Sequence, residues 1–147
     1  MKHFETYKKW LIIDSIIIML IGIYVAFFKE TKLFIFDNFL DQYFWSGNDM
    51  PLNGSINYLS FIYSIMGAVM LLWGILMYYI VKIPFGKKEL WSWKALTICI
   101  IVWFAIDEFF SLHYGAVFNA AFNIPFLIII ITPLLLSKKA FNEKEEN

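Results

Sequence analysis

Four predominantly apolar runs, separated by polar segments, organise this chain of 147 residues. The runs cover residues 10–28, 57–81, 93–112 and 115–136. At about 1.5 Å per residue, a helix of roughly 20 residues crosses the hydrocarbon core of a bilayer. Each run is long enough to span, and each is expected to be helical because no water satisfies backbone groups inside the hydrocarbon. The pattern predicts an all-α integral membrane protein, a single bundle of four transmembrane helices.

Composition supports a membrane environment. Apolar residues make up 61% of the chain and charged residues only 16%, whereas soluble domains carry about 25% charged residues. The excess apolar surface makes the lipid bilayer the expected partner. The formal net charge is zero, and no basic patch with interleaved aromatic residues is present, so nucleic acid is not expected as a partner.

The positions of the lysines predict the orientation. All twelve basic residues are lysines, and the four spans place ten of them on one side of the membrane. Since cytoplasmic loops are enriched in lysine, both termini are expected in the cytoplasm. The cytoplasmic set is Lys2, Lys8, Lys9, Lys82, Lys87, Lys88, Lys94, Lys138, Lys139 and Lys144, and the external set is Lys29 and Lys32.

The segments between the spans differ in character. The external loop, residues 29–56, contains an amphipathic stretch at residues 34–45 that is expected to form a short interfacial helix or to pack on the outer end of the bundle. Asp37 and Asp41 lie on its polar side. The inner loop is basic, and the C-terminal tail is charged and expected to be disordered. These two segments cover residues 82–92 and 137–147.

Small residues and one acid define the expected helix packing. A stripe of mostly small side chains on the second span predicts a seam where a neighbouring backbone approaches closely. Its members are Ser60, Ser64, Gly67 and Gly74. In the first span, Asp14 lies at the depth of Lys94 on the third, which predicts an ion pair near the cytoplasmic side. A proton-relay role for Asp14 is the alternative.

Polar groups gather at the external ends of the third and fourth spans. Adjacent carboxylates, Asp107 and Glu108, precede a very short turn near His113, and Asn119 and Asn123 follow at i, i+4 spacing. Adjacent helical residues point about 100° apart, so the two acids share one pocket only if it is wide or if the helix is locally unwound. Pro125 cannot donate a backbone hydrogen bond and is expected to kink the fourth helix beside the amides.

Two interpretations of this polar cluster remain open. In the structural one, the amides of Asn119 and Asn123 hydrogen-bond between helices, with Asp107 or Glu108 as acceptor. In the functional one, the cluster and the loop residues Asp37 and Asp41 line an outward-facing cavity that binds a cation, a proton or an amphipathic small molecule. The six-residue separation of Asp107 and His113 does not match metal-ligand spacing, so no metal and no cofactor is expected.

Three hypotheses for function follow. The first is a non-enzymatic accessory or ligand-binding membrane component. The second is a small ion, proton or solute transporter that acts as an oligomer. The third is an enzyme that uses Asp107 or Glu108 as acid or base on a lipid-like substrate. The first hypothesis is preferred, with a homo-oligomer or a larger membrane complex as the expected assembly and a bacterial plasma membrane as the expected location.

Overall fold

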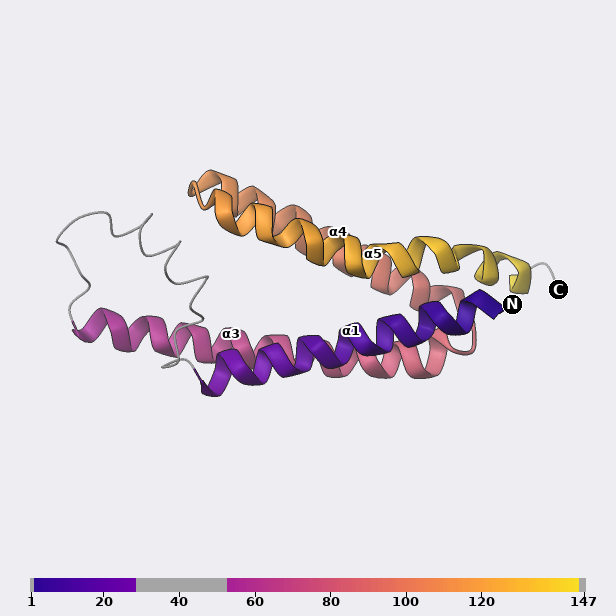
Figure 1. Cartoon of the computed structure of the whole chain (residues 1–147), viewed down its shortest axis with the longest axis horizontal. Coiled ribbons are helices and arrows are strands. Elements are labelled where there is room, and N and C mark those ends of the chain that lie inside the picture. The colour runs from indigo at the N-terminus through magenta and orange to yellow at the C-terminus, as the bar shows by residue number, and fades with distance from the viewer. Residues whose placement is uncertain (1, 29–52, 146–147) are drawn as a thin grey trace. The chain divides into compact units, whose positions relative to one another are not determined.

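The computed structural model describes residues 2–28 and 53–145, and within these ranges the chain is helical and contains no strand. The helices are α1 (Lys2–Phe27), α3 (Asn53–Ile80), the π-helix η1 (Val81–Phe85), α4 (Leu90–His113) and α5 (Val117–Glu145) (Figure 1). The expected interfacial helix at residues 34–45, with Asp37 and Asp41, lies outside the described residues.

Four of the described segments are long and apolar enough to cross a membrane, which confirms the expected all-helical, four-span architecture at this level. They are His3–Phe27, Ser60–Phe85, Leu90–His113 and Val117–Asn142. Most of their side chains are exposed in the isolated chain, as expected for helices that lipid surrounds. The four helices therefore suggest an integral membrane protein.

The helices extend beyond the apolar runs. The expectation of a disordered tail is wrong as far as Glu145, where α5 ends. Phe141 is fully buried, and its packing stabilises the last turns, which composition alone does not reveal. The inner loop is also shorter than expected, because η1 continues α3 to Phe85 and α4 already begins at Leu90.

The chain divides into two compact units. The first unit comprises Met1–Ile17 and Ile75–Asn147, and the second comprises Ile18–Gly74.

In the second unit, α1 and α3 approach closely at two glycines. A Cβ atom placed on Gly22 would lie 2.8 Å from the Gly67 carbonyl oxygen and 2.5 Å from the Leu71 nitrogen. A Cβ atom on Gly67 would clash with the backbone of Ala26 and lie 2.6 Å from the Gly22 oxygen. Since backbone atoms cannot move aside as a flexible side chain can, glycine is required at both positions for this packing.

In the first unit, three phenylalanines from distant parts of the chain form an aromatic cluster. The Phe4 and Phe85 rings stack with centroids 5.6 Å apart, and the Phe85 and Phe141 rings meet edge to face at 4.8 Å. Phe4 and Phe141 are 5.8 Å apart. All three side chains are buried. The packing of these rings stabilises the contact between the start of α1, the end of η1 and the end of α5.

The helices α4 and α5 form a hairpin whose members lie side by side (Figure 1). Its turn uses Gly115 at φ 72°, a conformation that favours glycine. Nearer the opposite end, the Trp93 indole donates to the Leu134 carbonyl over 2.7 Å. The hairpin is thus linked by polar contacts as well as by apolar packing.

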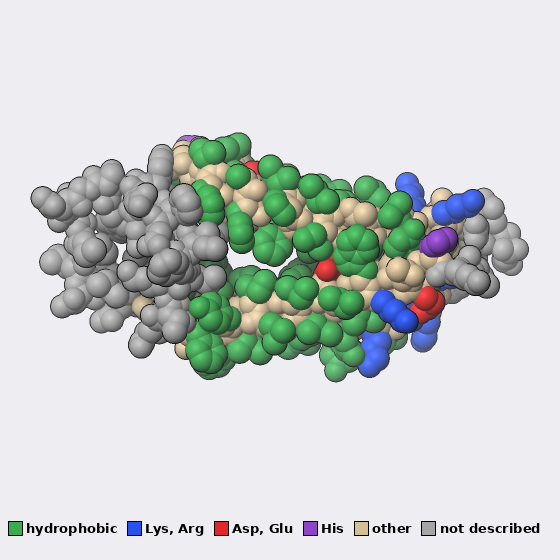
Figure 2. Space-filling view, in the orientation of Figure 1, with side chains coloured by type: hydrophobic (Ala, Val, Ile, Leu, Met, Phe, Trp, Pro, Cys, Tyr) green, Lys and Arg blue, Asp and Glu red, His purple; other side chains and the backbone are tan. Residues whose placement is uncertain are grey.

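Lysine side chains gather at the end of the first unit where α1 begins and α5 ends, and hydrophobic side chains cover the helices away from that end (Figure 2). Three of the lysines lie over aromatic rings: Lys82 Nζ is 5.2 Å from the Tyr78 centroid, Lys88 Nζ is 5.2 Å from the Phe4 centroid, and Lys138 Nζ is 5.4 Å from the Trp93 centroid. Such contacts suit a membrane boundary, where an aromatic ring has one apolar and one wet side.

Candidate functional site

The most extensive polar arrangement among the described residues joins α4 to α5. Asp107 Oδ1 accepts hydrogen bonds from Ser111 Oγ at 3.1 Å, from Asn119 Nδ2 at 2.8 Å and from Asn123 Nδ2 at 2.7 Å. Asn119 Nδ2 also lies 2.7 Å from Ser111 Oγ. We call these four residues the Asp107 cluster. Two of them stand at i, i+4 on α4 and two at i, i+4 on α5, so each helix contributes from a single face.

Two oxygen atoms, Asp107 Oδ1 and Ser111 Oγ, accept all the hydrogen bonds within the Asp107 cluster. One Asn119 amide hydrogen goes to Asp107 and the other to Ser111, whose own hydroxyl donates to Asp107. Asn123 is buried, with 6% of its surface exposed, and Ser111 is buried with 7% exposed. Charge-assisted bonds of this length are stronger than neutral ones. The cluster has the properties of a tie that holds the hairpin together.

This arrangement is the interhelical bonding that the structural interpretation expects, with Asp107 as acceptor. The residues that the sequence singles out do not include Ser111, although its i, i+4 spacing from Asp107 places it on the same face of the helix. The ligand-binding role assigned to Asp107, Glu108, Asn119 and Asn123 stays a prediction.

Glu108 does not take part in the Asp107 cluster. Its Oε1 atom is buried and has no hydrogen-bond partner among the described residues. The difference follows from helical geometry, since a residue adjacent to Asp107 points about 100° away. The Glu108 carboxylate therefore lies outside the Asp107 cluster.

His113 lies apart from these carboxylates. It is exposed, stacks on Phe109 with ring centroids 6.0 Å apart, and meets Tyr114 edge to face at 4.9 Å. Within residues 2–28 and 53–145, no three His, Cys, Asp or Glu side chains come close enough to hold a metal ion. His113 thus contributes to an aromatic turn rather than to the Asp107 cluster.

The expected ion pair between Asp14 and Lys94 does not form. Asp14 is only 5% exposed and its Oδ2 atom has no hydrogen-bond partner in the described part of the chain, whereas Lys94 is exposed. The salt bridge that the described residues do form joins Lys8 to Glu5 at 3.2 Å. Matching depth on two helices does not fix the direction in which each side chain points, which is why the expectation failed.

The small-residue stripe on α3 has mixed roles. Gly67 lies directly against the α1 backbone at Gly22 and Ala26, and Gly74 is buried. The Ser64 hydroxyl donates to the Ser60 carbonyl of its own helix at 2.9 Å. In this stripe, glycine rather than serine determines how closely the backbones approach.

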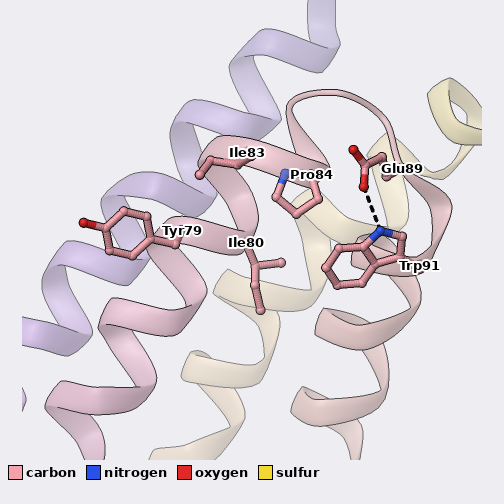
Figure 3. Close-up of a pocket in the computed structure, with 6 residues that line it drawn as sticks. All are labelled: Tyr79, Ile80, Ile83, Pro84, Glu89 and Trp91. Carbon is pink, nitrogen blue, oxygen red and sulfur yellow. Dashed lines mark hydrogen bonds between the residues drawn. The ribbon is translucent and has the colours of Figure 1, made fainter.

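A shallow apolar groove of about 350 Å³ lies near the basic end of the first unit (Figure 3). Trp91 Nε1 donates to Glu89 Oε2 over 2.7 Å at one side of it. The groove is remote from the Asp107 cluster, because sixteen residues of α4, or about 24 Å, separate Trp91 from Asp107. Its lining residues are Tyr79, Ile80, Ile83, Pro84, Glu89 and Trp91.

Residues 2–28 and 53–145 contain four helices that are long and apolar enough to cross a membrane, an architecture compatible with the class of multi-pass helical membrane proteins. No protein-family model, no curated protein and no solved structure matches the chain.

Proposed function

We propose that this chain is a non-enzymatic accessory component of a membrane assembly, with the Asp107 cluster as a structural tie within it. The observation that carries this proposal is that one carboxylate oxygen accepts three hydrogen bonds, two of them across the α4–α5 hairpin. A general acid or base must exchange its proton with a substrate. Asp107 Oδ1 instead accepts hydrogen bonds from three side chains of the protein itself. A rigid hairpin with lipid-facing apolar sides suits association with other membrane helices.

The proposed orientation places both termini in the cytoplasm of a bacterial cell. The gathering of lysines at one end of the first unit supports it (Figure 2), because positive residues are retained on the cytoplasmic side. A fluorescent protein fused after Asn147 should fluoresce, and alkaline phosphatase fused there should be inactive. An active phosphatase fusion would place the C-terminus outside and reject this orientation.

The functional proposal is tested by native mass spectrometry of the protein released from membrane nanodiscs. Wild type is expected as an oligomer or with a protein partner, and Asp107→Ala is expected to lose that assembly. Glu108→Gln serves as the matched control, since Glu108 is adjacent to Asp107 but outside the cluster, and it should assemble as wild type does.

Two outcomes would contradict the accessory role. A stoichiometric small molecule that is present in wild type and absent from Asp107→Ala would make the Asp107 cluster a ligand site. Product formation from a lipid-like substrate, lost in Glu108→Gln while the fold survives, would instead make the chain an enzyme.

A further inference from the structure

Besides Glu108 Oε1, the first unit contains two buried side-chain oxygens without a hydrogen-bond partner among the described residues and one backbone carbonyl without its usual helical donor. Asp14 Oδ2 and Thr97 Oγ1 are buried, and neither has a hydrogen-bond partner among the described residues. The third is the Ile129 carbonyl oxygen. Its i+4 neighbour in α5 is Pro133, which has no N–H to donate. Unsatisfied polar groups of this kind are expensive inside a bilayer, so three in one unit require an explanation.

Asp14 and the Ile129 carbonyl lie at nearly the same depth. Asp14 follows Phe4 by ten residues of α1, and Ile129 precedes Phe141 by twelve residues of α5. These separations correspond to about 15 Å and about 18 Å of helix. Since the rings of Phe4 and Phe141 are in contact, both distances are measured from the same point, the aromatic cluster.

Thr97 reaches this depth on α4. The Trp93 indole hydrogen-bonds the Leu134 carbonyl, and Leu134 precedes Phe141 by seven residues, or about 10 Å of helix. Thr97 lies one turn beyond Trp93, which places it about 16 Å from the aromatic cluster. Three helices of one unit thus present an unpartnered oxygen at one level.

Burial directs these oxygens toward the interior of the unit. Asp14 is 5% exposed and Pro133 less than 2% exposed. The ring of a proline in a helix lies against the carbonyl of residue i−4, so the freed Ile129 carbonyl lies against the buried Pro133 ring, while the Ile129 side chain itself is 43% exposed. The other proline of this helix, Pro125, is exposed, and the carbonyl that it frees therefore faces outward.

We propose that Asp14 Oδ2, Thr97 Oγ1 and the Ile129 carbonyl bind one small monovalent cation of the size of sodium. All three are oxygen ligands, which hard cations prefer. One carboxylate neutralises one positive charge, whereas a divalent ion would leave a net charge in a medium of low dielectric constant. Backbone carbonyls that lack a helical donor also coordinate sodium in membrane transporters. Lys94 is exposed and does not occupy this position.

Equilibrium binding of radioactive sodium to the purified full-length protein in detergent tests this site, with choline chloride maintaining the ionic strength. Wild type should bind close to one sodium ion per chain, saturably. Asp14→Asn should abolish binding. Thr97→Val removes a ligand, and Pro133→Ala restores an N–H to the Ile129 carbonyl, so each should weaken binding by at least about tenfold, or about 1.4 kcal/mol.

The chain offers a matched control for each of these variants. Thr132→Val removes a hydroxyl that already donates to the Ile128 carbonyl of its own helix at 2.6 Å. Pro125→Ala restores an N–H on the exposed side of α5. Glu108→Gln removes a charge about 16 Å further along α4 than Thr97. All three should bind sodium as wild type does.

Circular dichroism and gel filtration identify variants that retain the fold, and only those are scored. If Asp14→Asn does not fold, the comparison of Thr97→Val with Thr132→Val decides. The proposal is overturned if folded wild type shows no saturable sodium binding, which would leave a protonated Asp14 as the explanation. It is equally overturned if Thr97→Val and Pro133→Ala bind as tightly as their controls.

Discussion

Asp107 and Asp14 are two acids in apolar helices of the same unit, and they differ in their hydrogen-bond partners. Asp107 accepts three hydrogen bonds from Ser111, Asn119 and Asn123. Asp14 is buried, and its Oδ2 has no such partner among the described residues. A buried carboxylate requires compensation. Asp107 receives it from protein donors and thereby joins two helices, whereas Asp14 Oδ2 receives no hydrogen bond from residues 2–28 and 53–145.

The largest expected effect comes from removing the carboxylate of the Asp107 cluster. Asp107→Ala eliminates three hydrogen bonds and leaves the amides of Asn119 and Asn123 buried without an acceptor. With about 0.6–1.7 kcal/mol for each such bond inside a membrane, the free energy of unfolding should fall by about 2–5 kcal/mol. Unfolding by SDS in mixed micelles measures it. A fall no larger than that of Glu108→Ala would show that the cluster does not stabilise the hairpin.

A change in the second unit tests whether the loss in Asp107→Ala is local. Gly67→Ala places a methyl group against the backbone of Gly22 and Ala26, and overpacking of this kind typically costs about 1–3 kcal/mol. The exposed neighbour Ala68 provides the control substitution Ala68→Ser, which should change little. Because the two sites share no partner, the effects of Gly67→Ala and Asp107→Ala should add in the double variant, measured by the same unfolding assay. Strong non-additivity would contradict independent sites.

A smaller effect is expected at the edge of the Asp107 cluster. Ser111→Ala removes one donor to Asp107 and one acceptor for Asn119, but both of those residues keep their direct bond to each other. The free energy of unfolding should fall by about 1 kcal/mol. Ser137→Ala is the matched control, since that buried hydroxyl donates to the Leu134 carbonyl of its own helix at 2.9 Å. Equal losses of unfolding free energy in both variants would show that the Ser111 hydroxyl does not stabilise the contact between α4 and α5.

The smallest effect is expected at Asp14 in sodium-free buffer. Asp14→Asn removes a charge without breaking any hydrogen bond of the described chain, so the unfolding free energy should be unchanged or higher. Asp107→Asn, the same chemical change, should lower it because charge-assisted bonds become neutral ones. If Asp14→Asn lowered the unfolding free energy as much as Asp107→Asn does, the proposed difference between the two acids would be wrong.

The sequence predicts the four helices and the hydrogen bonding of one of the two acids. Four apolar runs are sufficient to predict four spans, and Asn119 and Asn123 are correctly expected to hydrogen-bond an acid across the hairpin. Periodicity could not choose between Asp107 and Glu108, because a rotation of one helix by 100° exchanges them. That choice depends on how α4 packs against α5, which is a tertiary property.

Contacts between distant segments could not be predicted from the sequence. The aromatic cluster brings together Phe4, Phe85 and Phe141, whose separation along the chain hides their proximity. The ion pair of Asp14 with Lys94 was expected from depth alone, but depth along a helix leaves rotation about its axis undetermined. The buried Pro133 gave no signal, because local sequence does not reveal which of the two prolines of α5 faces the interior.

A double-mutant cycle between Asp107 and Asn123 tests the central claim most directly. The unfolding free energies of wild type, Asp107→Ala, Asn123→Ala and the double variant isolate the energy of the contact between α4 and α5. A structural tie with its 2.7 Å bond predicts a coupling of about 1 kcal/mol or more. Additive effects, with no coupling, would show that the two side chains act independently and would contradict the account of the Asp107 cluster.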